Sequence, residues 1–255
     1  MARIFITGST DGLGLAAARS LMDEGHAIVL HARSEARAAD LGPERERAAA
    51  VVVGDLADAD ATRGVADQVN ALGRMDAVIH NAGVYVRPER GNTAQGHAVT
   101  LAINTLAPWL LTALMERPDR LVCMSSGLHR QGDGSLADID WVERPWDGAR
   151  AYAETKLQVA ALAIALARRW PTVRCNAVDP GWVRTRMGGE GAPRDLAVGA
   201  ATQAWLAGSD EAAGESDGYW HDRCRQRPAA EVEDQRFGDA LLARLAALTG
   251  VDLPD

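Results

Sequence analysis

Tyr152 and Lys156 are the residues of this chain whose types and spacing most clearly suggest chemistry. They lie four positions apart at the start of an Ala- and Leu-rich stretch that predicts a helix, so their side chains should share one helix face. A free phenol has a pKa of about 10, and a neighbouring ammonium group favours the phenolate and lowers that pKa. The spacing therefore predicts that Tyr152 can donate and accept a proton near neutral pH.

A glycine-rich segment near the N-terminus predicts a nucleotide site. The first strand pattern runs into this segment, and a helix pattern follows directly. Glycines let the backbone turn sharply and approach a pyrophosphate, and the free N–H groups of a helix N-terminus favour an anion. The spacing is Gly-x-x-x-Gly-x-Gly rather than the Gly-x-Gly-x-x-Gly of many dehydrogenases. We expect the following residues to contact the dinucleotide: Gly8, Ser9, Thr10, Asp11, Gly12, Leu13 and Gly14.

The ends of the next two strand patterns bear on which dinucleotide binds. An NAD site usually has an acidic residue at the end of the second strand, whereas an arginine there accommodates the 2′-phosphate of NADP. Ala32 stands at this position and Arg33 follows it. NADP(H) is therefore preferred and NAD(H) is possible, although Arg33 could be an ordinary surface charge. Asp55, which precedes Leu56, could accept a hydrogen bond from adenine or could cap a helix or turn.

Alternating strand and helix patterns define the fold class. Short apolar runs predict strands at residues 3–7, 27–31, 50–53, 77–80, 121–124 and 173–178. Between them, helical patterns predict helices at residues 13–24, 61–72, 95–115 and 152–169. This alternation predicts an α/β protein, a single-domain Rossmann-type doubly wound parallel β-sheet flanked by helices.

We expect one domain over residues 1–255, with the nucleotide-binding part in residues 1–120 and the catalytic and substrate part in residues 121–255. Two stretches, residues 127–149 and 188–195, show no regular pattern. Both follow strand ends, where sheets of this class bind ligands, and long loops are often functional.

Composition and charge argue against several other classes of protein. Hydrophobic residues make up 47% of the chain, which is typical of a globular protein, and the net charge of −8 argues against a nucleic-acid binder. No apolar run approaches the roughly 20 residues of a membrane span, and the start of the chain lacks the layout of a secretory signal. The cysteines form no Cys-x-x-Cys pair, so we expect reduced thiols in a cytoplasmic protein.

Further motifs, in order along essentially the whole chain, resemble those of the short-chain dehydrogenase/reductase family. The matching residues are Gly8, Gly12 and Gly14 of the glycine-rich turn, Asn81-Ala82-Gly83 after the fourth strand, Asn104, Ser125-Ser126 after the fifth strand, Tyr152 and Lys156, and Pro180-Gly181 with the following residues 182–185. Each motif is weak alone, but their order and separations together are specific.

The resemblance implies an NADP(H)-dependent oxidoreductase that transfers hydride between nicotinamide and an apolar carbonyl or alcohol substrate. Tyr152 would exchange the proton, Ser126 would hydrogen-bond the substrate oxygen, and Lys156 would lower the Tyr152 pKa and hold the nicotinamide ribose. Asn104 would position a water that links Lys156 to solvent. The implied cofactor contacts also include Asn81, Ala82, Gly83, Pro180, Gly181, Val183 and Thr185, the last of which would hold the carboxamide.

A subgroup is also indicated, because Ser126 lies 26 positions before Tyr152, about twice the gap of many family members. The intervening segment and the C-terminal part resemble those of retinol dehydrogenases and the WW-domain-containing oxidoreductase. That subgroup typically uses NADP(H) on retinoids, steroids or other apolar carbonyls. The chain departs from it in having no membrane anchor, no WW domain and Asp11 where a basic residue would stand. We therefore expect a soluble, microbial-type relative whose NADP selectivity rests mainly on Arg33.

Other interpretations stay open at this point. A non-catalytic, redox-sensing dinucleotide-binding protein would share the fold but would not need the four catalytic residues. An epimerase or dehydratase relative would usually have a longer C-terminal substrate domain. The chain could form a homodimer or homotetramer through residues 95–115 and 152–169, although the Ala-rich face of the latter helix could equally pack on its own sheet. The histidines have no metal-ligand spacing, and tryptophans near the loops could anchor them or line an apolar pocket.

Overall fold

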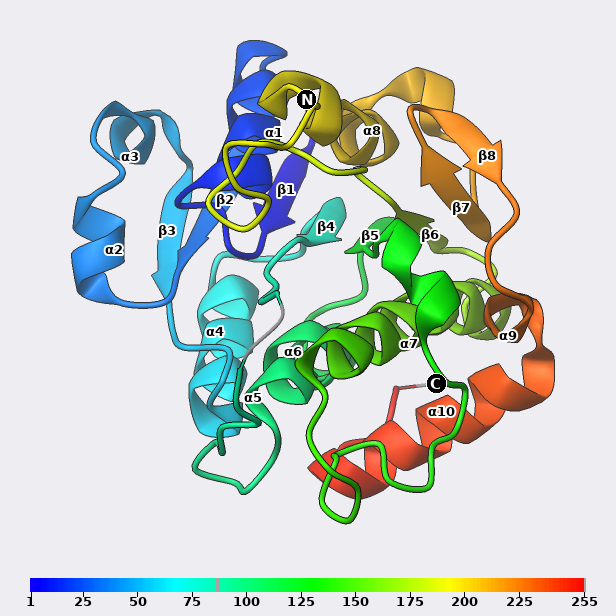
Figure 1. The fold of residues 1–255 in the computed structure, drawn as a ribbon. Helices are drawn as coiled ribbons and strands as arrows, with labels where there is room; N and C mark the ends of the chain where they lie inside the picture. Colours follow the sequence, from blue (N-terminus) through cyan, green and yellow to red (C-terminus); the bar gives the residue numbers. More distant parts are fainter. Residues whose placement is uncertain (86–87, 255) are drawn as a thin grey trace.

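The computed structural model describes residues 1–85 and 88–254. At its centre is an eight-stranded sheet with the order β3-β2-β1-β4-β5-β6-β7-β8 (Figure 1). The strands are β1 (Arg3–Ile6), β2 (Ala27–Ala32), β3 (Ala50–Val53), β4 (Ala77–His80), β5 (Arg120–Met124), β6 (Arg174–Val178), β7 (Gly218–His221) and β8 (Cys224–Gln226). Neighbouring strands are parallel except for β7 and β8. The predicted single-domain Rossmann-type doubly wound sheet is confirmed.

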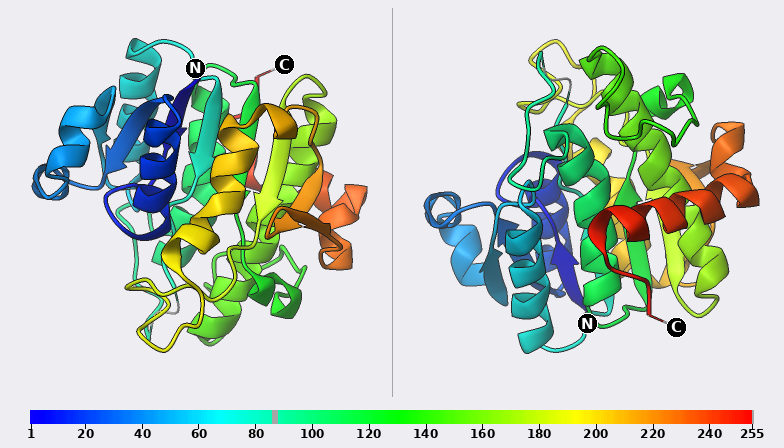
Figure 2. Two further views of the ribbon diagram at one scale, coloured as in Figure 1. Left: turned by 90° about the horizontal axis from the view of Figure 1, so that it is seen from above. Right: turned by 90° about the horizontal axis from the view of Figure 1, so that it is seen from below.

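Helices cover both faces of the sheet. The left view of Figure 2 shows α1 (Gly12–Asp23) and α8 (Leu196–Gly208) on one face. The right view shows α4 (Ala59–Ala71), α6 (Ala107–Leu114) and α7 (Gly148–Arg169) on the other face, with α10 (Gln235–Thr249) lying across them on the outside. The shorter segments are α2 (Glu35–Ala39), α3 (Pro43–Arg47), α5 (Val99–Leu101), the π-helical turn η1 (Ala102–Leu106), the 3₁₀ turns η2 (Gly127–Gln131) and η3 (Asp210–Ala212), and α9 (Ala230–Glu233). Within the described ranges, no helix combines the length and the apolar character needed to cross a bilayer.

Alternate side chains of the strands, apart from the exposed β8, build two cores, one on each face of the sheet. In β1, Ile4 and Ile6 pack in the same cluster as Leu21 of α1, whereas Phe5 packs in the opposite cluster with Trp109 of α6. All three strand residues are fully buried. Because both faces are covered, the strand has a continuous apolar sequence, as expected for a parallel sheet between helices.

The order of the strands brings the carboxyl ends of β2, β1 and β4 together. β1 lies between β2 and β4, with Ile6 beside Leu30 on one side and Ile79 on the other. Strands before β4 are therefore added in one direction and later strands in the other, which makes the β1–β4 boundary a topological switch point. In sheets of this class, ligands bind in the crevice at the carboxyl ends of the strands beside such a point.

The six predicted strands are all present, with ends that differ by at most one residue from those expected. The helix predicted at residues 95–115 begins only at Val99, because residues before it form a loop closed by a bridge between Asn92 and Ala98, and it contains the turn η1. The helix predicted from residue 152 begins earlier, at Gly148, because Asp147 accepts hydrogen bonds from the N–H groups of Ala149 and Arg150.

The strand pair β7–β8 and the helices α8 and α10 were not predicted. Strand β8 has only exposed residues, so it leaves no apolar pattern in the sequence. Of the two stretches expected to be irregular, residues 127–149 contain the 3₁₀ turn η2 and the first turn of α7, whereas residues 188–195 have no helix or named strand.

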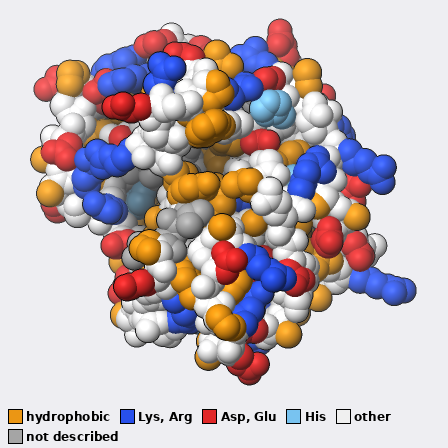
Figure 3. All heavy atoms as spheres, viewed as in Figure 1, with side chains coloured by type: hydrophobic (Ala, Val, Ile, Leu, Met, Phe, Trp, Pro, Cys, Tyr) orange, Lys and Arg blue, Asp and Glu red, His pale blue; other side chains and the backbone are white. Residues whose placement is uncertain are grey.

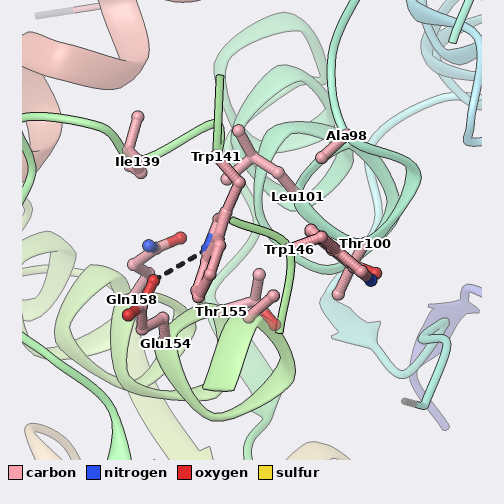
Figure 4. A pocket seen from close by; sticks show the side chains of 10 residues that line it. Ala98, Thr100, Leu101, Ile139, Trp141, Trp146, Glu154, Thr155 and Gln158 are labelled. Atoms are coloured by element: carbon pink, nitrogen blue, oxygen red, sulfur yellow. Dashed lines mark hydrogen bonds between the residues drawn. The ribbon is translucent and has the colours of Figure 1, made fainter. Parts of the chain in front are cut away.

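The segment between η2 and α7, called the inserted segment below, packs onto the outer face of α7 (Figure 4). Trp141 donates from Nε1 to Glu154 Oε2 at 3.0 Å, and Arg144 donates to both carboxylate oxygens of Glu154. The Arg144 guanidinium lies 3.6 Å from the centroid of the Trp141 ring. Asp140 accepts a hydrogen bond from the N–H of Ala98, which ties the same segment to the start of α5. These contacts make the inserted segment a fixed cover rather than a free loop.

The C-terminal helix α10 covers the remaining outer surface of α6 and α7. Leu241 and Leu245 of α10 are fully buried, and Trp109 of α6 donates to Thr249 Oγ1 at 2.9 Å. Every residue of α7 from position 151 to position 166 is buried within the chain itself. The surface through which we expected a second copy to pair is therefore already occupied by α10 and the inserted segment.

Candidate active site

The turn between β1 and α1 requires glycine at two positions. Gly8 has φ +61°, and a Cβ atom on it would lie 2.9 Å from the Cα of Ala82. A Cβ atom on Gly14 would lie 2.5 Å from both Asn81 Nδ2 and the carbonyl oxygen of Gly8. Real Cβ atoms do not approach so closely, so side chains are excluded where the backbone of the turn meets the segment after β4. Because these positions carry no side chain, the backbone of the turn is accessible to a ligand.

Hydrogen bonds fasten residues 81–83 to this turn. Thr7 Oγ1 accepts from the N–H groups of Asn81 and Ala82, both at 2.9 Å. Asn81 Nδ2 in turn donates to the carbonyl oxygens of Thr7 at 3.0 Å and Gly8 at 3.1 Å. The predicted cofactor residues Asn81, Ala82 and Gly83 are thus held beside the predicted phosphate turn.

Ser9 and His31 support the turn from inside the protein. Ser9 is fully buried, and its hydroxyl donates to the carbonyl of Ile6 and accepts from the N–H of His31. His31 Nδ1 accepts from the N–H of Gly8 at 3.0 Å, so Nε2 carries the proton and donates to the carbonyl of Gly54 at 2.9 Å. Burial lowers the pKa of His31, which favours this neutral form. The Ser9 side chain therefore supports the turn, and the expected cofactor contact of Ser9 stays a prediction for its backbone.

The N-terminus of α1 fits a pyrophosphate. Helices α4, α7, α8 and α10 each begin with an Asp side chain that accepts backbone N–H groups, but Asp11 makes no such cap on α1. The first N–H groups of α1, at Gly12 to Gly14, are thus left for another acceptor, and the positive end of the helix dipole favours an anion there. Together with the side-chain-free turn, this end of α1 suits the phosphates of a dinucleotide.

The segment after β6 approaches the same turn. The methyl group of Thr185 would lie 3.7 Å from a Cβ atom on Gly12. Gly181 has φ +75°, which turns the chain after Pro180, and Val183 is buried with 4% exposure. Of the residues expected here to contact the cofactor, Thr185 therefore lies nearest to the helix N-terminus, whereas the Val183 side chain packs inside.

Arg33 and Asp55 lie just after the ends of the neighbouring strands β2 and β3, and both are exposed. Asp55 Oδ1 accepts from the N–H of Ala57 at 2.9 Å, which is the turn-capping role considered from the sequence. The side chain of Leu56 is only 5% exposed, so it belongs to the core. Arg33 makes no hydrogen bond or ion pair with the described residues.

Lys156 and Asn104 converge beside Gly83. A Cβ atom on Gly83 would lie 3.4 Å from both Lys156 Nζ and Asn104 Oδ1. Lys156 is 5% exposed, and its Nζ donates to the carbonyl oxygen of Met124 at 2.8 Å. Burial lowers the pKa of Lys156 to about 8, because the ammonium group loses hydration there. The helix α7 and the turn η1 thus bring two predicted catalytic residues together beside Gly83.

Tyr152 is 6% exposed, and the Ser126 side chain lies beside its phenol. We expected Lys156 to lower the pKa of this phenol. Instead, the pKa of Tyr152 is raised to about 12, because burial disfavours the phenolate more than the neighbouring Ser126 hydroxyl favours it. Lys156 Nζ lies 5.6 Å from the centroid of the Tyr152 ring and is already bonded to the main chain of β5. The expectation that Lys156 lowers the pKa of Tyr152 is therefore wrong for the protein without bound cofactor.

Asn104 lies in the π-helical turn η1, a kind of irregularity that is frequent at functional sites. Its Oδ1 accepts from the N–H of Val84 at 2.8 Å, and its Nδ2 donates to the carbonyl of Val84 and to Thr155 Oγ1, both at 3.0 Å. Thr155 Oγ1 in turn donates to the carbonyl of Tyr152. The side-chain amide thus joins the segment after β4 to α7, and the expected role of Asn104 in positioning a water stays a prediction.

Ser125 and Ser126 have different roles at the end of β5. Ser125 is buried and donates from Oγ to the carbonyl oxygen of Lys156 at 2.8 Å. Ser126 is partly exposed, caps η2 by accepting from the N–H of Leu128, and reaches Tyr152. Ser126 is thus the one of the pair that is accessible beside the phenol.

Three residues at the site escaped the sequence-based predictions. Tyr85 places its ring edge-on to that of Tyr152, with 4.8 Å between the centroids, and is 44% exposed. Arg37 of α2 reaches back to the glycine-rich turn. His31 supports that turn through Gly8. The only sequence signals were an aromatic residue two positions after Asn-Ala-Gly, a second arginine four positions after Arg33, and a histidine inside an apolar strand.

The histidines that we expected to be structural make hydrogen bonds within the protein. These bonds join His80 to Thr112, His97 to Asp140, His129 to the carbonyl of Ser126, and His221 to the carbonyl of Asp179. Among the described residues, no group of three or more His, Cys, Asp or Glu side chains could hold a metal ion. Of the loop tryptophans, Trp141 and Trp220 are buried anchors, whereas Trp182 is 61% exposed.

Comparison with known proteins defines the class of this protein. A family model described as "short chain dehydrogenase" matches residues 2–195. The chain is 38% identical over 258 residues to the short-chain dehydrogenase chry4 of Gibberella zeae, covering 100% of this chain and 99% of that one. The chain therefore belongs to the short-chain dehydrogenase family, and it is an oxidoreductase that acts on CH–OH or C=O groups.

More distant relatives agree with this assignment. Human retinol dehydrogenase 13 is 28% identical over 283 residues, covering 98% of this chain and 85% of that one, in line with the expected subgroup. A crystal structure from Mycobacterium paratuberculosis has a TM-score of 0.84 at 26% identity and covers 100% of this chain and 96% of its own. A blue fluorescent protein from a metagenomic library, solved in complex with NADPH, has the same fold, with a TM-score of 0.69 at 24% identity over 86% of this chain and 94% of its own.

Proposed function

We propose that this oxidoreductase uses NADP(H) to interconvert an apolar carbonyl compound and its alcohol, with Tyr152 exchanging the proton. The observation that carries the proposal is the convergence of Ser126, Tyr152, Lys156 and Asn104 at the carboxyl edge of the sheet. The segment after β4, which lies beside Lys156 and is hydrogen-bonded to Asn104, is also bonded directly to the glycine-rich turn. A protein that only bound a dinucleotide would not need this set of side chains beside it.

The nicotinamide would supply or accept the hydride when it is bound. The raised pKa of Tyr152 keeps the phenol protonated at neutral pH, so it would donate its proton to the substrate oxygen in reduction and recover it in oxidation. Ser126, which lies beside Tyr152, would donate to the same oxygen as negative charge develops on it. Lys156 has three N–H donors, of which one is used by Met124, so it retains donors for the nicotinamide ribose.

The preference for NADP(H) rests on the end of β2. Ala32 is buried with 1% exposure and offers no carboxylate to the ribose hydroxyls, and the exposed Arg33 follows it. The NADPH in the metagenomic protein of the same fold is consistent with this choice. NAD(H) would lack the phosphate that an arginine at this position accommodates.

An apolar substrate is favoured by the side chains beside the site. Tyr85 contacts Tyr152, and Trp182 and Met187, on the segment that carries Thr185, are 61% and 44% exposed. Figure 3 shows that this face of the molecule is hollowed near its middle and that hydrophobic side chains gather along the hollow. Exposed aromatic and apolar side chains beside a cleft are typical of sites for apolar ligands.

The first test is NADPH oxidation, followed by absorbance, with aldehydes and ketones of increasing size and with NADH in parallel. We expect turnover with apolar carbonyls and a preference for NADPH. Tyr152→Phe should lower kcat at least roughly 100-fold, because it removes the proton donor. Binding of NADPH to that variant, measured by fluorescence, should be retained.

Tight NADPH binding without turnover over the whole panel would refute the enzymatic proposal and support the redox-sensing alternative. Turnover that prefers NADH would refute only the cofactor preference. Turnover that is undiminished in Tyr152→Phe would refute the role of the phenol.

A further inference from the structure

Arg37 reaches the glycine-rich turn from the helix that follows β2. Ser34 caps this helix by accepting from the N–H of Arg37 at 3.3 Å, which fixes the start of α2. The Arg37 guanidinium donates from Nη2 to Asp11 Oδ2 at 2.7 Å and to Thr10 Oγ1 at 3.3 Å. Its Nη1 donates to Asp40 Oδ2 at 3.1 Å. The Arg37 side chain is only 22% exposed, so its position over the turn is well defined.

Asp11 is placed to hold this arginine rather than the helix. It occupies the N-cap position of α1 but accepts no hydrogen bond from the backbone of α1. Its Oδ2 bonds Arg37, and Arg186 Nη1 lies 3.9 Å from the same oxygen. The Asp11 side chain is 54% exposed, so water screens the ion pair and makes it exchangeable.

A nearby arginine has no such partner. Arg33 is exposed at the end of β2, four residues before Arg37, and is not paired with any described residue. Arg33 and Arg37 thus flank the start of α2 beside the glycine-rich turn. A guanidinium group binds a phosphate in a two-pronged geometry that suits this position.

We propose that Arg37 is a second ligand for the 2′-phosphate of adenosine and that Asp11 competes with this phosphate for the Arg37 guanidinium. Asp11 thereby sets how strongly the protein distinguishes NADP(H) from NAD(H). The proposal rests on the proposed dinucleotide function and deepens it. The phosphate carries a charge of about −1.5 to −2 at neutral pH, so it can displace the exposed Asp11 carboxylate from Nη2 of Arg37, while Asp40 stays bonded to Nη1. The displaced carboxylate remains beside the phosphate and repels it, which limits the affinity.

The experiment compares binding of 2′,5′-ADP and 5′-ADP by calorimetry, because these ligands differ only in the 2′-phosphate and undergo no hydride transfer. We expect Asp11→Asn to tighten 2′,5′-ADP binding roughly 10-fold by removing the competing charge, while 5′-ADP is unaffected. Arg37→Gln should weaken 2′,5′-ADP roughly 10-fold. In the double variant Asp11→Asn, Arg37→Gln, the gain from Asp11→Asn should disappear.

The matched control is Asp23→Asn. Asp23 lies at the other end of α1 and pairs with Arg47, so this variant makes the same change in net charge without touching Arg37. It should leave the ratio of the two affinities unchanged. Circular dichroism and thermal melting establish that each variant is folded, and Arg37→Lys, which keeps the charge but loses the fork, provides a second substitution at that position.

An unchanged or lowered preference for 2′,5′-ADP in Asp11→Asn would overturn the proposal. So would a gain that persists in the double variant, because it would then come from general charge rather than from Arg37. A wild-type enzyme that prefers NADH would contradict the proposed cofactor preference, but the effect of Asp11→Asn on 2′,5′-ADP would still decide the role of Arg37.

Discussion

Tyr152 lies in surroundings that favour the neutral phenol. Its side chain is almost completely buried, and the resulting loss of hydration raises its pKa to about 12 although the neighbouring Ser126 acts in the opposite direction. The site is thus prepared to give a proton in reduction. Oxidation needs the phenolate, so without bound cofactor the protein holds Tyr152 in the form suited to the reductive direction.

At the residue scale, the first prediction concerns this ionisation. In the cofactor-free protein, Tyr152 should stay protonated at neutral pH and ionise only as the pH approaches about 12, because a raised pKa of an acid means that its neutral form persists to higher pH. Ultraviolet difference spectra of wild type against Tyr152→Phe during alkaline titration measure the phenolate of this one residue. A difference signal that develops near neutral pH would contradict the prediction and would restore the expected effect of Lys156.

A second prediction at this scale concerns Tyr85. Its exposed ring, edge-on to Tyr152, is positioned to contact an apolar substrate near the reacting oxygen. Tyr85→Ala should raise KM for bulky aromatic carbonyls roughly 10-fold, consistent with about 0.5–1.5 kcal/mol for an aromatic pair in addition to lost apolar contact. Small aliphatic aldehydes serve as the control substrates, and an equal effect on both classes would indicate that Tyr85 only orients Tyr152.

At the scale of elements, the β1–α1 turn can be tested with two glycines that differ only in their surroundings. A methyl group on Gly14 would lie 2.5 Å from Asn81 and Gly8, whereas one on Gly64, inside α4, would meet nothing within 4 Å. Gly14→Ala should therefore destabilise the protein by about 1–3 kcal/mol and weaken dinucleotide binding.

Gly64→Ala should instead stabilise the protein by about 0.5–1 kcal/mol, because alanine is the better helix former and costs less entropy on folding. Urea unfolding and cofactor titration of both variants provide the measurements. Equal stabilities of the two variants would mean that the turn can relax around a side chain.

The inserted segment and α10 are the elements that distinguish this molecule from a bare doubly wound sheet. The carboxylate of Glu154 is buried, and it accepts hydrogen bonds from both Trp141 and Arg144. Burial raises the pKa of Glu154, because the carboxylate loses hydration. The Arg144 guanidinium partly offsets this rise. The segment that lies beside the site is therefore held at its far end by α7, the helix that carries Tyr152 and Lys156.

At the scale of the whole molecule, the covered surface of α6 and α7 leads to a prediction about assembly. We expect a monomer with a mass near 27.1 kDa, because α10 and the inserted segment occupy the face through which a partner was expected to pack. Light scattering coupled to size-exclusion chromatography measures this mass over a range of protein concentrations. A stable dimer would mean that a different surface pairs, and chemical cross-linking would then identify it.

Local signals in the sequence were sufficient for much of this molecule. The six parallel strands were recognised because continuous apolar runs mark strands that are buried on both faces. The glycine-rich turn was recognised because only glycine can occupy Gly8 and Gly14, where the backbone approaches its neighbours closely. Tyr152 and Lys156 share a face of α7 because helical periodicity alone fixes that relation.

Other features depended on contacts between distant parts of the chain, so only the tertiary structure decided them. The strand β8 is exposed and has no apolar pattern, and the position of α10 follows from the surface on which it packs. Arg37 and Asp11 are 26 positions apart and meet only because β2 lies beside β1. The raised pKa of Tyr152 results from burial, a property of the folded molecule, whereas its spacing from Lys156 had indicated the opposite direction. The sequence thus determined which groups take part, and packing determined which of them meet and in which protonation state.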